Sequence, residues 1–502
     1  MVALGCFMVG VWTLIRFFNQ GPNFDQVGQQ VLAHQWLHGL HSGSVIGPTN
    51  YVLKMLLLYI PLDLTSLPAQ FKLVFMTLLV NIATFVLLVY GLRLLYSEFN
   101  LKLKNSFYLP LVYLALISGS VYWISFSNSR NLEVATGVFL IYFYIRTQTH
   151  PSRFYYGLLI ILGSLLFFAD PLQIYMTLLP VIMFIGLRAA AKWDRQQLAT
   201  LLGLISCAAI SILLAHSLAA VVRDIWNVSF IDTKQSVIFS STSLKNSIEQ
   251  MARLYGGGFE GGRLREAIDL LVVAGGIVGA GYYAWRKPKS RWPLLLAATV
   301  WTVDLGVYII SGQAQQTDTN RYLIMTVPMF ILALTVILYY LPKRIRVYVV
   351  AFVLLLNTAT LAVGFARAWN PHFSHNNHDR AAIAYFTDYK YAYGYASIGT
   401  ALSSDYLSNW HVNLLPLGCD PDYILKKTNL FYDKAAFKVT QKSDANDLIP
   451  VMLDGDNIRI NQSACGATQI ERQLGPWQKM DYLKDGSTVL LYKAEQLHHL
   501  RG

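Results

Sequence analysis

Long apolar runs, separated by short polar connections, dominate the first 370 residues of the chain. A run of about 17 to 25 mostly apolar residues can cross the hydrocarbon layer of a bilayer as an α-helix, because the helix satisfies its own backbone hydrogen bonds. The chain is therefore predicted to be a polytopic α-helical membrane protein, with a membrane domain over 1–369. About eleven spanning helices are expected, at 2–18, 71–95, 106–125, 133–147, 154–169, 172–188, 197–222, 267–285, 292–312, 322–341 and 346–368.

Every second connection between these runs is rich in basic residues. Basic connections of membrane proteins stay in the cytoplasm, so the N-terminus is predicted to be cytoplasmic. The opposite side receives a long first outer loop (19–70), a middle loop (223–266) and short turns near 127–133, 169–171 and 313–321. The basic residues of the five cytoplasmic connections are Lys102 and Lys104; Arg146 and Arg153; Arg188, Lys192 and Arg195; Arg286, Lys287, Lys289 and Arg291; and Lys343, Arg344 and Arg346.

The pattern changes at residue 370, where polar and apolar positions begin to mix as in a soluble protein. A helix is predicted over Asp379–Tyr389, and strands are predicted over Val412–Leu417, Leu448–Leu453 and Thr488–Tyr492. Residues 370–502 are therefore expected to form an α/β domain, which the predicted topology places outside the cytoplasm.

Composition supports this division. Of all residues 54% are apolar and only 14% are charged, whereas about a quarter are charged in a soluble domain. Residues 370–502 hold 13 Lys or Arg and 14 Asp or Glu, so the net charge of +12 belongs to the membrane domain. Because its basic residues lie in loops between apolar runs, membrane topology explains them and no nucleic-acid partner is expected.

Two of the four cysteines, Cys419 and Cys465, fall in the predicted outer domain. In an oxidising compartment they could form a disulfide; the alternative is two separate buried thiols. Cys6 and Cys207 lie in apolar runs and are expected to be small packing residues.

The first outer loop is predicted to begin with an interfacial helix that has a partly apolar face and contains an acid and three histidines. Asp25 follows the first span by a few residues, where its carboxylate can meet both water and the membrane surface. Two interpretations remain for Asp25, a functional carboxylate or a cap of this helix. His34, His38 and His41 share one helix face, a spacing that can bind metal, but an interfacial polar stripe is the simpler interpretation.

Two arginines break the charge pattern, because they lie in short outer turns. Arg130 stands near Glu133, and Arg321 stands near Asp318. A guanidinium at the membrane surface suits bidentate binding of a lipid phosphate. The alternative is an ion pair that orders each turn.

Two acids lie at or within predicted spans. Asp170 precedes Pro171 in a tight outer turn, where it either caps the next helix or binds substrate. Asp304 lies inside the ninth span, and acids at this depth are rare and tend to be functional.

The whole arrangement resembles the membrane-embedded glycosyltransferases that use lipid-phosphate-linked sugars, the class of the protein O-mannosyltransferases and aminoarabinose transferases. The first loop carries the likeness, with FDQVGQQVLAHQWLHG followed by GPTNYVLKMLLLYIP, and so do the outer turns ADPLQIYMTLLP and NRYLIMTVP. The outer-domain segments YGYASIGTALSSDYLSNWHVNLLPL and LKKTNLFYDKAAF are similar to those of related chains. Asp25 stands alone at a position where many members have two adjacent acids.

This resemblance implies a cell-membrane enzyme that transfers a hexose or pentose from polyprenyl phosphate to a glycan, lipid or protein acceptor. It implies Asp25 as the general base, and it implies that Arg321 and Arg130 hold the donor phosphate, with Asp170, Glu133, His34 and Lys72 as further substrate-binding residues. No metal ligand is assigned, and the single acid leaves the need for a divalent cation open.

Two other classes remain at this point. In a transporter or flippase for a lipid-linked or anionic substrate, Asp304 and Asp170 would be the substrate or ion sites. In a non-catalytic scaffold, the outer domain would bind a partner. The long first loop favours the enzyme, because transporters concentrate polar groups at the middle of the membrane.

Overall fold

The structure is a computed structural model, in which the chain divides into two compact units. The helical unit comprises Met1–Thr13, Leu78–Ala219 and Thr233–Arg367, and the α/β unit comprises Leu14–Thr77, Ala220–Asp232 and Ala368–Gly502. The described residues are 2–20, 24–38, 45–46, 50–101, 131–191, 195–226, 229–230, 244–247, 250, 254, 262–311, 323–352, 355, 376–419, 424–427, 448–453, 457–460 and 463–500.

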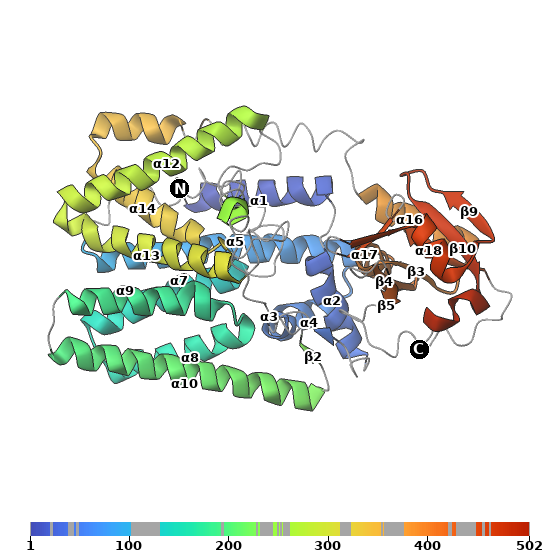
Figure 1. The fold of residues 1–502 in the computed structure, drawn as a ribbon, viewed down its shortest axis with the longest axis horizontal. Helices are drawn as coiled ribbons and strands as arrows, with labels where there is room; N and C mark the ends of the chain where they lie inside the picture. The colour runs from blue at the N-terminus through green and yellow to red at the C-terminus, as the bar shows by residue number, and fades with distance from the viewer. Residues whose placement is uncertain are drawn as a thin grey trace. The chain divides into compact units, whose positions relative to one another are not determined.

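Helices occupy nine of the predicted spans, and the predicted span 346–368 is described only at its start, where residues 343–352 are helical. The span predicted over 106–125 lies outside the described residues. The helices are α1 (Val2–Gln20), α5 (Ala69–Glu98), α7 (Asn131–Thr149), α8 (Arg153–Ala169), α9 (Leu179–Ala190), α10 (Arg195–Trp226), α12 (Gly262–Arg286), α13 (Pro288–Ile310) and α14 (Thr326–Tyr340), as Figure 1 shows.

Among the described residues, three helices, α5, α10 and α13, are long and apolar enough to cross a membrane. Four shorter helical stretches are also apolar, Val2–Val11, Arg153–Ala169, Ile174–Ala190 and Thr326–Tyr340. The total of eleven spans stays a prediction.

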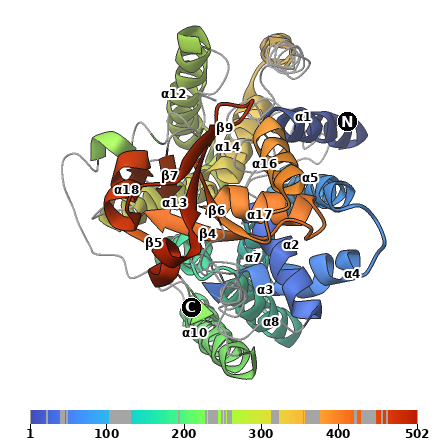
Figure 2. The ribbon, with the colours of Figure 1, turned by 90° about the vertical axis from the view of Figure 1, so that its right-hand side faces the viewer.

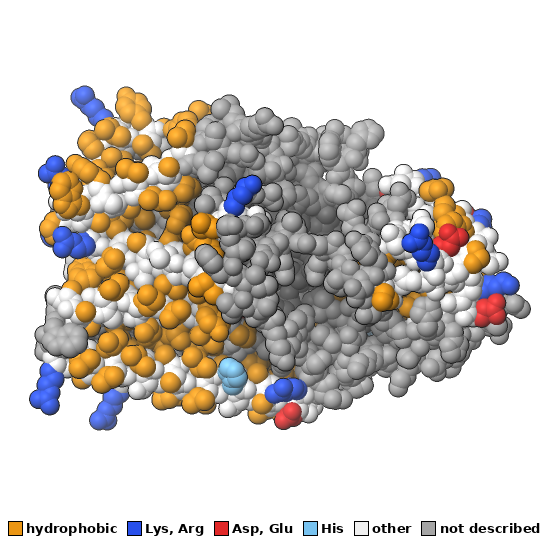
Figure 3. Space-filling model, in the orientation of Figure 1, with side chains coloured by type: hydrophobic (Ala, Val, Ile, Leu, Met, Phe, Trp, Pro, Cys, Tyr) orange, Lys and Arg blue, Asp and Glu red, His pale blue; other side chains and the backbone are white. Residues whose placement is uncertain are grey.

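The surface of the helical unit suits lipid rather than water. Large apolar side chains such as Phe154, Leu213 and Ile277 are more than half exposed, and hydrophobic side chains cover much of the described part of its visible face, with Lys and Arg at one end of the helices (Figure 3). An apolar surface of this extent requires a nonaqueous environment.

Two π-helical turns interrupt the regular helices, η1 (Met55–Tyr59) and η3 (Ile174–Leu178). Each runs into a helix with a proline in its first turn, Pro61 in α4 (Ile60–Asp63) and Pro180 in α9. Proline has no backbone N–H and its ring crowds the preceding turn. The wider π turn relieves this, because backbone N–H groups there bond to carbonyls five residues back.

The α/β unit is built on a six-stranded sheet with strand order β5-β4-β3-β6-β10-β9. The central strands β4, β3 and β6 are parallel, and the strands outside them are antiparallel to their neighbours. The strands are β3 (Gly394–Ser397), β4 (Leu414–Cys419), β5 (Leu425–Lys427), β6 (Leu448–Leu453), β9 (Lys479–Tyr482) and β10 (Thr488–Lys493). The expected C-terminal sheet region is thus confirmed, while the unit that contains it also includes Leu14–Thr77 and Ala220–Asp232.

Alternating side chains of this sheet form two hydrophobic cores. Tyr395 and Leu490 belong to the core on one face, and Ala396 and Leu491 belong to the core on the other. Helix α18 (Ala467–Leu474) covers the first face, while α16 (Asn376–Tyr389) and α17 (Ile398–Leu407) cover the second (Figure 2). The chain ends in the 3-10 helix η8 (Ala494–Leu500).

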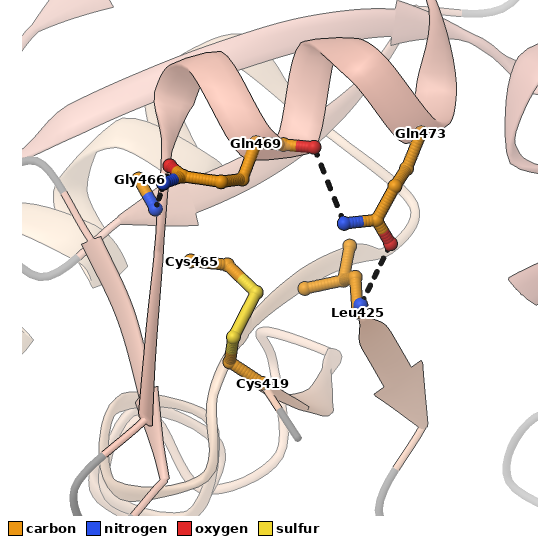
Figure 4. Close-up of a disulfide and its surroundings, with 6 residues drawn as sticks. All are labelled: Cys419, Leu425, Cys465, Gly466, Gln469 and Gln473. Atoms are coloured by element: carbon orange, nitrogen blue, oxygen red, sulfur yellow. Dashed lines mark hydrogen bonds between the residues drawn. A yellow bond between two sulfur atoms is a disulfide. The ribbon is translucent and has the colours of Figure 1, made fainter. Parts of the chain in front are cut away.

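A disulfide joins Cys419, the last residue of β4, to Cys465. Cys465 lies in the hairpin of β7 (Asn457–Ile460) and β8 (Ser463–Gly466). Beside the bridge, Gln473 of α18 accepts a hydrogen bond from the backbone of Leu425 at 2.7 Å (Figure 4). The disulfide predicted as one alternative is therefore present.

The α/β unit also contains the whole of the first loop, 19–70. Its elements are α2 (Phe24–Leu37), β1 (Val45–Ile46), α3 (Asn50–Lys54), η1 and α4, and β1 pairs in parallel with β2 (Ser229–Phe230). Helix α2 packs against α17 and against α4. This packing brings side chains of the first loop together with side chains of the C-terminal residues.

Candidate functional site

The structure describes some of the predicted site residues and not others. Asp25 lies in the first turn of α2, and its side chain is not among those described. Arg130 and Arg321 lie outside the described residues, as do His41 and Asp318. Their roles as base and phosphate ligands, and the ion pairs proposed as the alternative for the arginines, therefore stay predictions.

Two predicted residues, His34 and Lys72, meet at Asp63 in the α/β unit. The His34 Nδ1 lies 3.0 Å from the Asp63 Oδ2. The Lys72 ammonium donates to the backbone carbonyl of Asp63 at 3.0 Å and reaches its Oδ1 at 3.4 Å. The three side chains come from α2, the end of α4 and the first turn of α5, so the loop between α4 and α5 folds back to bring them together.

The Asp63 carboxylate is held in its ionised form. Burial alone would raise its pKa, but the hydrogen bond from His34 and the charge of Lys72 outweigh burial, and the pKa lies below its ordinary value. Because an ionised carboxylate only accepts hydrogen bonds, Nδ1 of His34 must carry the hydrogen. The outcome is an imidazole of fixed orientation whose Nε2 is available for another contact.

An aromatic wall borders this cluster. The Trp410 indole stacks on the His34 ring, with centroids 4.5 Å apart and planes 13° apart. Tyr406, near the end of α17, is buried close to Asp63, and its pKa is raised by burial and then by the negative charge of Asp63.

Trp410 owes its position to a strained turn after α17. Asn409 and Trp410 both have left-handed backbones, with φ of 53° and 65°, a conformation that is rare for a tryptophan. The Trp410 N–H bonds to the Asp405 carbonyl at 2.8 Å, and the Asp405 carboxylate accepts the N–H of Leu414 at 2.7 Å. Strain of this kind is retained when surrounding contacts fix it, and it is frequent at functional sites.

Sequence reasoning missed Asp63, Tyr406 and Trp410 as members of this cluster. Asp63 was visible as the second acid of the first loop, but its pairing with His34 joins positions 29 residues apart. Among the described residues, no group of three His, Cys, Asp or Glu side chains could hold a metal ion.

The remaining predicted residues lie in the helical unit. The Asp170 carboxylate accepts the backbone N–H of Leu172 at 3.3 Å and the side-chain amide of Gln173 at 3.2 Å. The N-cap of η3 is Gln173, so which of the two interpretations of Asp170 holds stays open. Thr177 of η3 donates to the same Gln173 at 2.6 Å, so Asp170 begins a buried polar chain. Glu133 is buried in the first turn of α7.

Asp304 is also buried in the helical unit, on α13, as the position inside a span predicted. Neither of its carboxylate oxygens has a hydrogen-bond partner in the described part of the chain. Helix α13, which carries Asp304, packs against α9, α12, α14 and η3. The residue is therefore an interior acid of the membrane helices, as predicted for this depth.

No family model matches the sequence, and no curated protein matches it. Among solved structures, ArnT from Cupriavidus metallidurans bound to undecaprenyl phosphate is similar over 100% of this chain and 98% of that chain, with a TM-score of 0.58 and 13% identity. The chain has the ArnT fold. ArnT in the apo state is similar over 98% of this chain and 97% of that chain, with a TM-score of 0.56 and 12% identity.

The likeness to the aminoarabinose transferases, expected from the first loop and the outer turns, is thus confirmed at the level of the fold. The Archaeoglobus fulgidus oligosaccharyltransferase in complex with Zn and sulfate is less similar, with a TM-score of 0.49 and 12% identity over 91% of this chain and 68% of that chain. At these identities no residue role passes from ArnT to this chain, so the roles of individual side chains are argued from this chain alone.

Proposed function

We propose that this protein is a glycosyltransferase that moves a sugar from a polyprenyl-phosphate donor to an acceptor hydroxyl at the outer face of the cell membrane. The ArnT fold over the whole chain is the observation that carries the proposal, because one ArnT structure was solved with undecaprenyl phosphate bound. In this proposal the N-terminus is cytoplasmic, residues 1–369 hold the lipid donor, and residues 370–502 form the outer domain.

The proposed reaction needs few chemical groups. The acceptor oxygen attacks the anomeric carbon of the donor, the bond from that carbon to the phosphate oxygen breaks, and the phosphate leaves with the electron pair. Asp25 takes the proton of the acceptor hydroxyl as general base. Direct displacement inverts the configuration of the anomeric carbon.

Cations are assigned to the phosphate. Arg321 and Arg130 would stabilise the charge that develops on the leaving phosphate, and Lys72 would hold a phosphate oxygen while Asp63 fixes the ammonium. His34, Glu133 and Asp170 complete the proposed substrate contacts. The reaction balances without a metal ion, and addition of a chelator to the assay shows whether a divalent cation takes part.

The first test is sugar transfer by the purified full-length protein, offered undecaprenyl phosphate linked to radiolabelled mannose, glucose or aminoarabinose. Asp25→Asn should lower turnover on the order of a hundredfold, the usual contribution of a positioned base. If Asp25 only caps α2, its asparagine variant should be nearly neutral, since Asn caps as well as Asp.

The matched control is Asp388→Asn, the same change at an exposed position of α16, which should transfer sugar at the parent rate. Arg321→Ala should raise the donor KM as well as lower turnover, because the same contact holds the phosphate before and during the reaction. If the protein transfers no sugar but moves the intact lipid-linked sugar across the membrane of proteoliposomes, it is a flippase and not a glycosyltransferase.

A further inference from the structure

Buried polar atoms without hydrogen-bond partners lie on α2 and α17 of the α/β unit. Gln30 is only 3% exposed, yet its Oε1 and its Nε2 both lack a partner in the described structure. The hydroxyl of Tyr406, a residue 2% exposed, lacks one as well. More than nine in ten buried polar groups of folded proteins are paired, so atoms left this way need an explanation.

The two helices that carry these atoms are neighbours in the α/β unit. Helices α2 and α17 pack against each other, and Gln30 lies four residues before His34, so the two share a face of α2. Trp410 stacks on His34, and Asp63 bonds to His34 and lies close enough to Tyr406 to raise the pKa of its hydroxyl. We call Gln30, His34 and Tyr406 the α2–α17 polar site.

The chemistry of the available atoms selects the ligand. The Gln30 amide can donate and accept, and so can the Tyr406 hydroxyl, but neither carries a charge. A phosphate would need cations and a metal ion would need anionic or imidazole ligands in larger number. Adjacent groups that donate and accept, next to aromatic rings, match the hydroxyls of a sugar.

We propose that the α2–α17 polar site binds one sugar ring through the Gln30 amide, the His34 Nε2 and the Tyr406 hydroxyl. Asp63 positions His34 for this contact, and Trp410 holds its ring in place. The inference deepens the proposed function and rests on it where the sugar is identified with a transferase substrate. Two sources share this chemistry, the sugar of the donor and a glycan acceptor.

Direct binding tests the site without transfer. The purified full-length protein is titrated with methyl α-mannoside, methyl β-glucoside and methyl β-arabinoside, and binding is followed by saturation-transfer NMR. At least one probe should bind, and Gln30→Met and Tyr406→Phe should each weaken it about five- to tenfold, the effect of one lost neutral hydrogen bond.

Tyr492→Phe is the matched control. Tyr492 is also a buried tyrosine whose hydroxyl lacks a partner, but it lies in the sheet core of the same unit. Its variant should bind the probes like the parent. Because Gln30→Met and Tyr406→Phe remove atoms without partners in the fold, the midpoint of thermal unfolding should not fall in either.

Kinetics separate the two sources and the two proposals. If Tyr406→Phe raises the KM for the donor, the site binds the sugar of the donor. If it raises the KM for the acceptor, the site binds the acceptor. If the protein binds a probe through Gln30 and Tyr406 but transfers no sugar, the proposed function is wrong and the proposed sugar site stands. If the protein transfers sugar but binds no probe, the proposed sugar site is wrong and the proposed function stands. The same holds if it transfers sugar and both variants keep the parental probe binding and KM.

Discussion

Asp63 organises three elements of the α/β unit through one carboxylate. It fixes the His34 ring on α2 and the Lys72 ammonium on α5, and it stands at the end of α4. An ionised group with two such partners contributes to stability, and this contribution depends on pH.

The sign of this dependence follows from the lowered pKa of Asp63. The stabilisation is present above the unfolded value of about 4 and is lost as pH falls through that value to the folded pKa. Asp63→Asn should cost about 1–3 kcal/mol at pH 7. Between about pH 5 and 3, the thermal midpoint of the parent in detergent should fall more steeply than that of the variant. Parallel curves would show that the carboxylate has no folded-state partner in solution.

The sequence predicted only some of the residues that form the cluster around Asp63. The family resemblance implied His34 and Lys72 as substrate-binding residues, and both are in the cluster. Their link was not predictable, because a hydrogen bond over 29 residues depends on how the loop folds back. Trp410 was hidden for another reason, since a left-handed backbone at a tryptophan has no signature in residue type.

Packing between elements is closest where glycine faces a neighbouring helix. A Cβ at Gly137 of α7 would lie 2.8 Å from the Thr177 Oγ1 and 3.1 Å from the Gln173 Oε1, within the polar chain that begins at Asp170. A Cβ at Gly157 of α8 would meet nothing within 4 Å. The two glycines are both inside helices, so they differ mainly in this contact.

Gly137→Ala should therefore destabilise the protein by about 1–3 kcal/mol, because the short Thr177 side chain cannot give way without loss of its hydrogen bond. Gly157→Ala should stabilise it by up to about 1 kcal/mol, the difference in helix propensity. Thermal unfolding in detergent measures both. Equal effects of the two substitutions would mean that α7 and η3 are not in close contact.

The disulfide also links separate elements, since it joins residues 46 positions apart in the sequence. In the chain-entropy model a loop of this length gives about 4 kcal/mol. The double variant Cys419→Ser, Cys465→Ser should unfold at a lower temperature and lose the sensitivity of the parent to dithiothreitol. Thiol titration of unreduced, denatured protein should find two thiols, Cys6 and Cys207; four would mean that no bridge forms.

The elements themselves were predictable where the pattern was long or regular. The strand expected over Leu448–Leu453 has those limits, and α16 contains the predicted helix. Strands β3, β5, β7, β8 and β9 were not predicted, because three or four residues are too few to show a period. The turns η1 and η3 were not predicted either, since the periodicity of apolar residues does not distinguish a π turn from an α turn.

The orientation of the whole molecule rests on its charges. All five predicted cytoplasmic connections are basic, and Glu98, an acid near them, is paired with Arg146 at 3.1 Å. Because acidic residues contribute little to the positive-inside rule, Glu98 does not weaken the pattern.

Labelling of intact cells with a membrane-impermeant maleimide tests this orientation. In a background with Cys6 and Cys207 replaced by serine, Lys484→Cys, at an exposed turn of the α/β unit, should react, because the topology places it outside. Lys289→Cys, exposed in a basic connection, should react only after the cells are opened. The reverse pattern would exclude the proposed outer-face reaction.

The π turn η3 also affects how this chain is compared with others. A π turn holds about one residue more than the α-helical turn that it replaces. A relative with an uninterrupted α-helix at this point has one residue fewer, so its alignment needs a single gap between Ile174 and Leu178. Without that gap the register of one flank is wrong by one position, and at 12–13% identity the error would assign Asp170 before the turn, or Pro180 after it, to the wrong column.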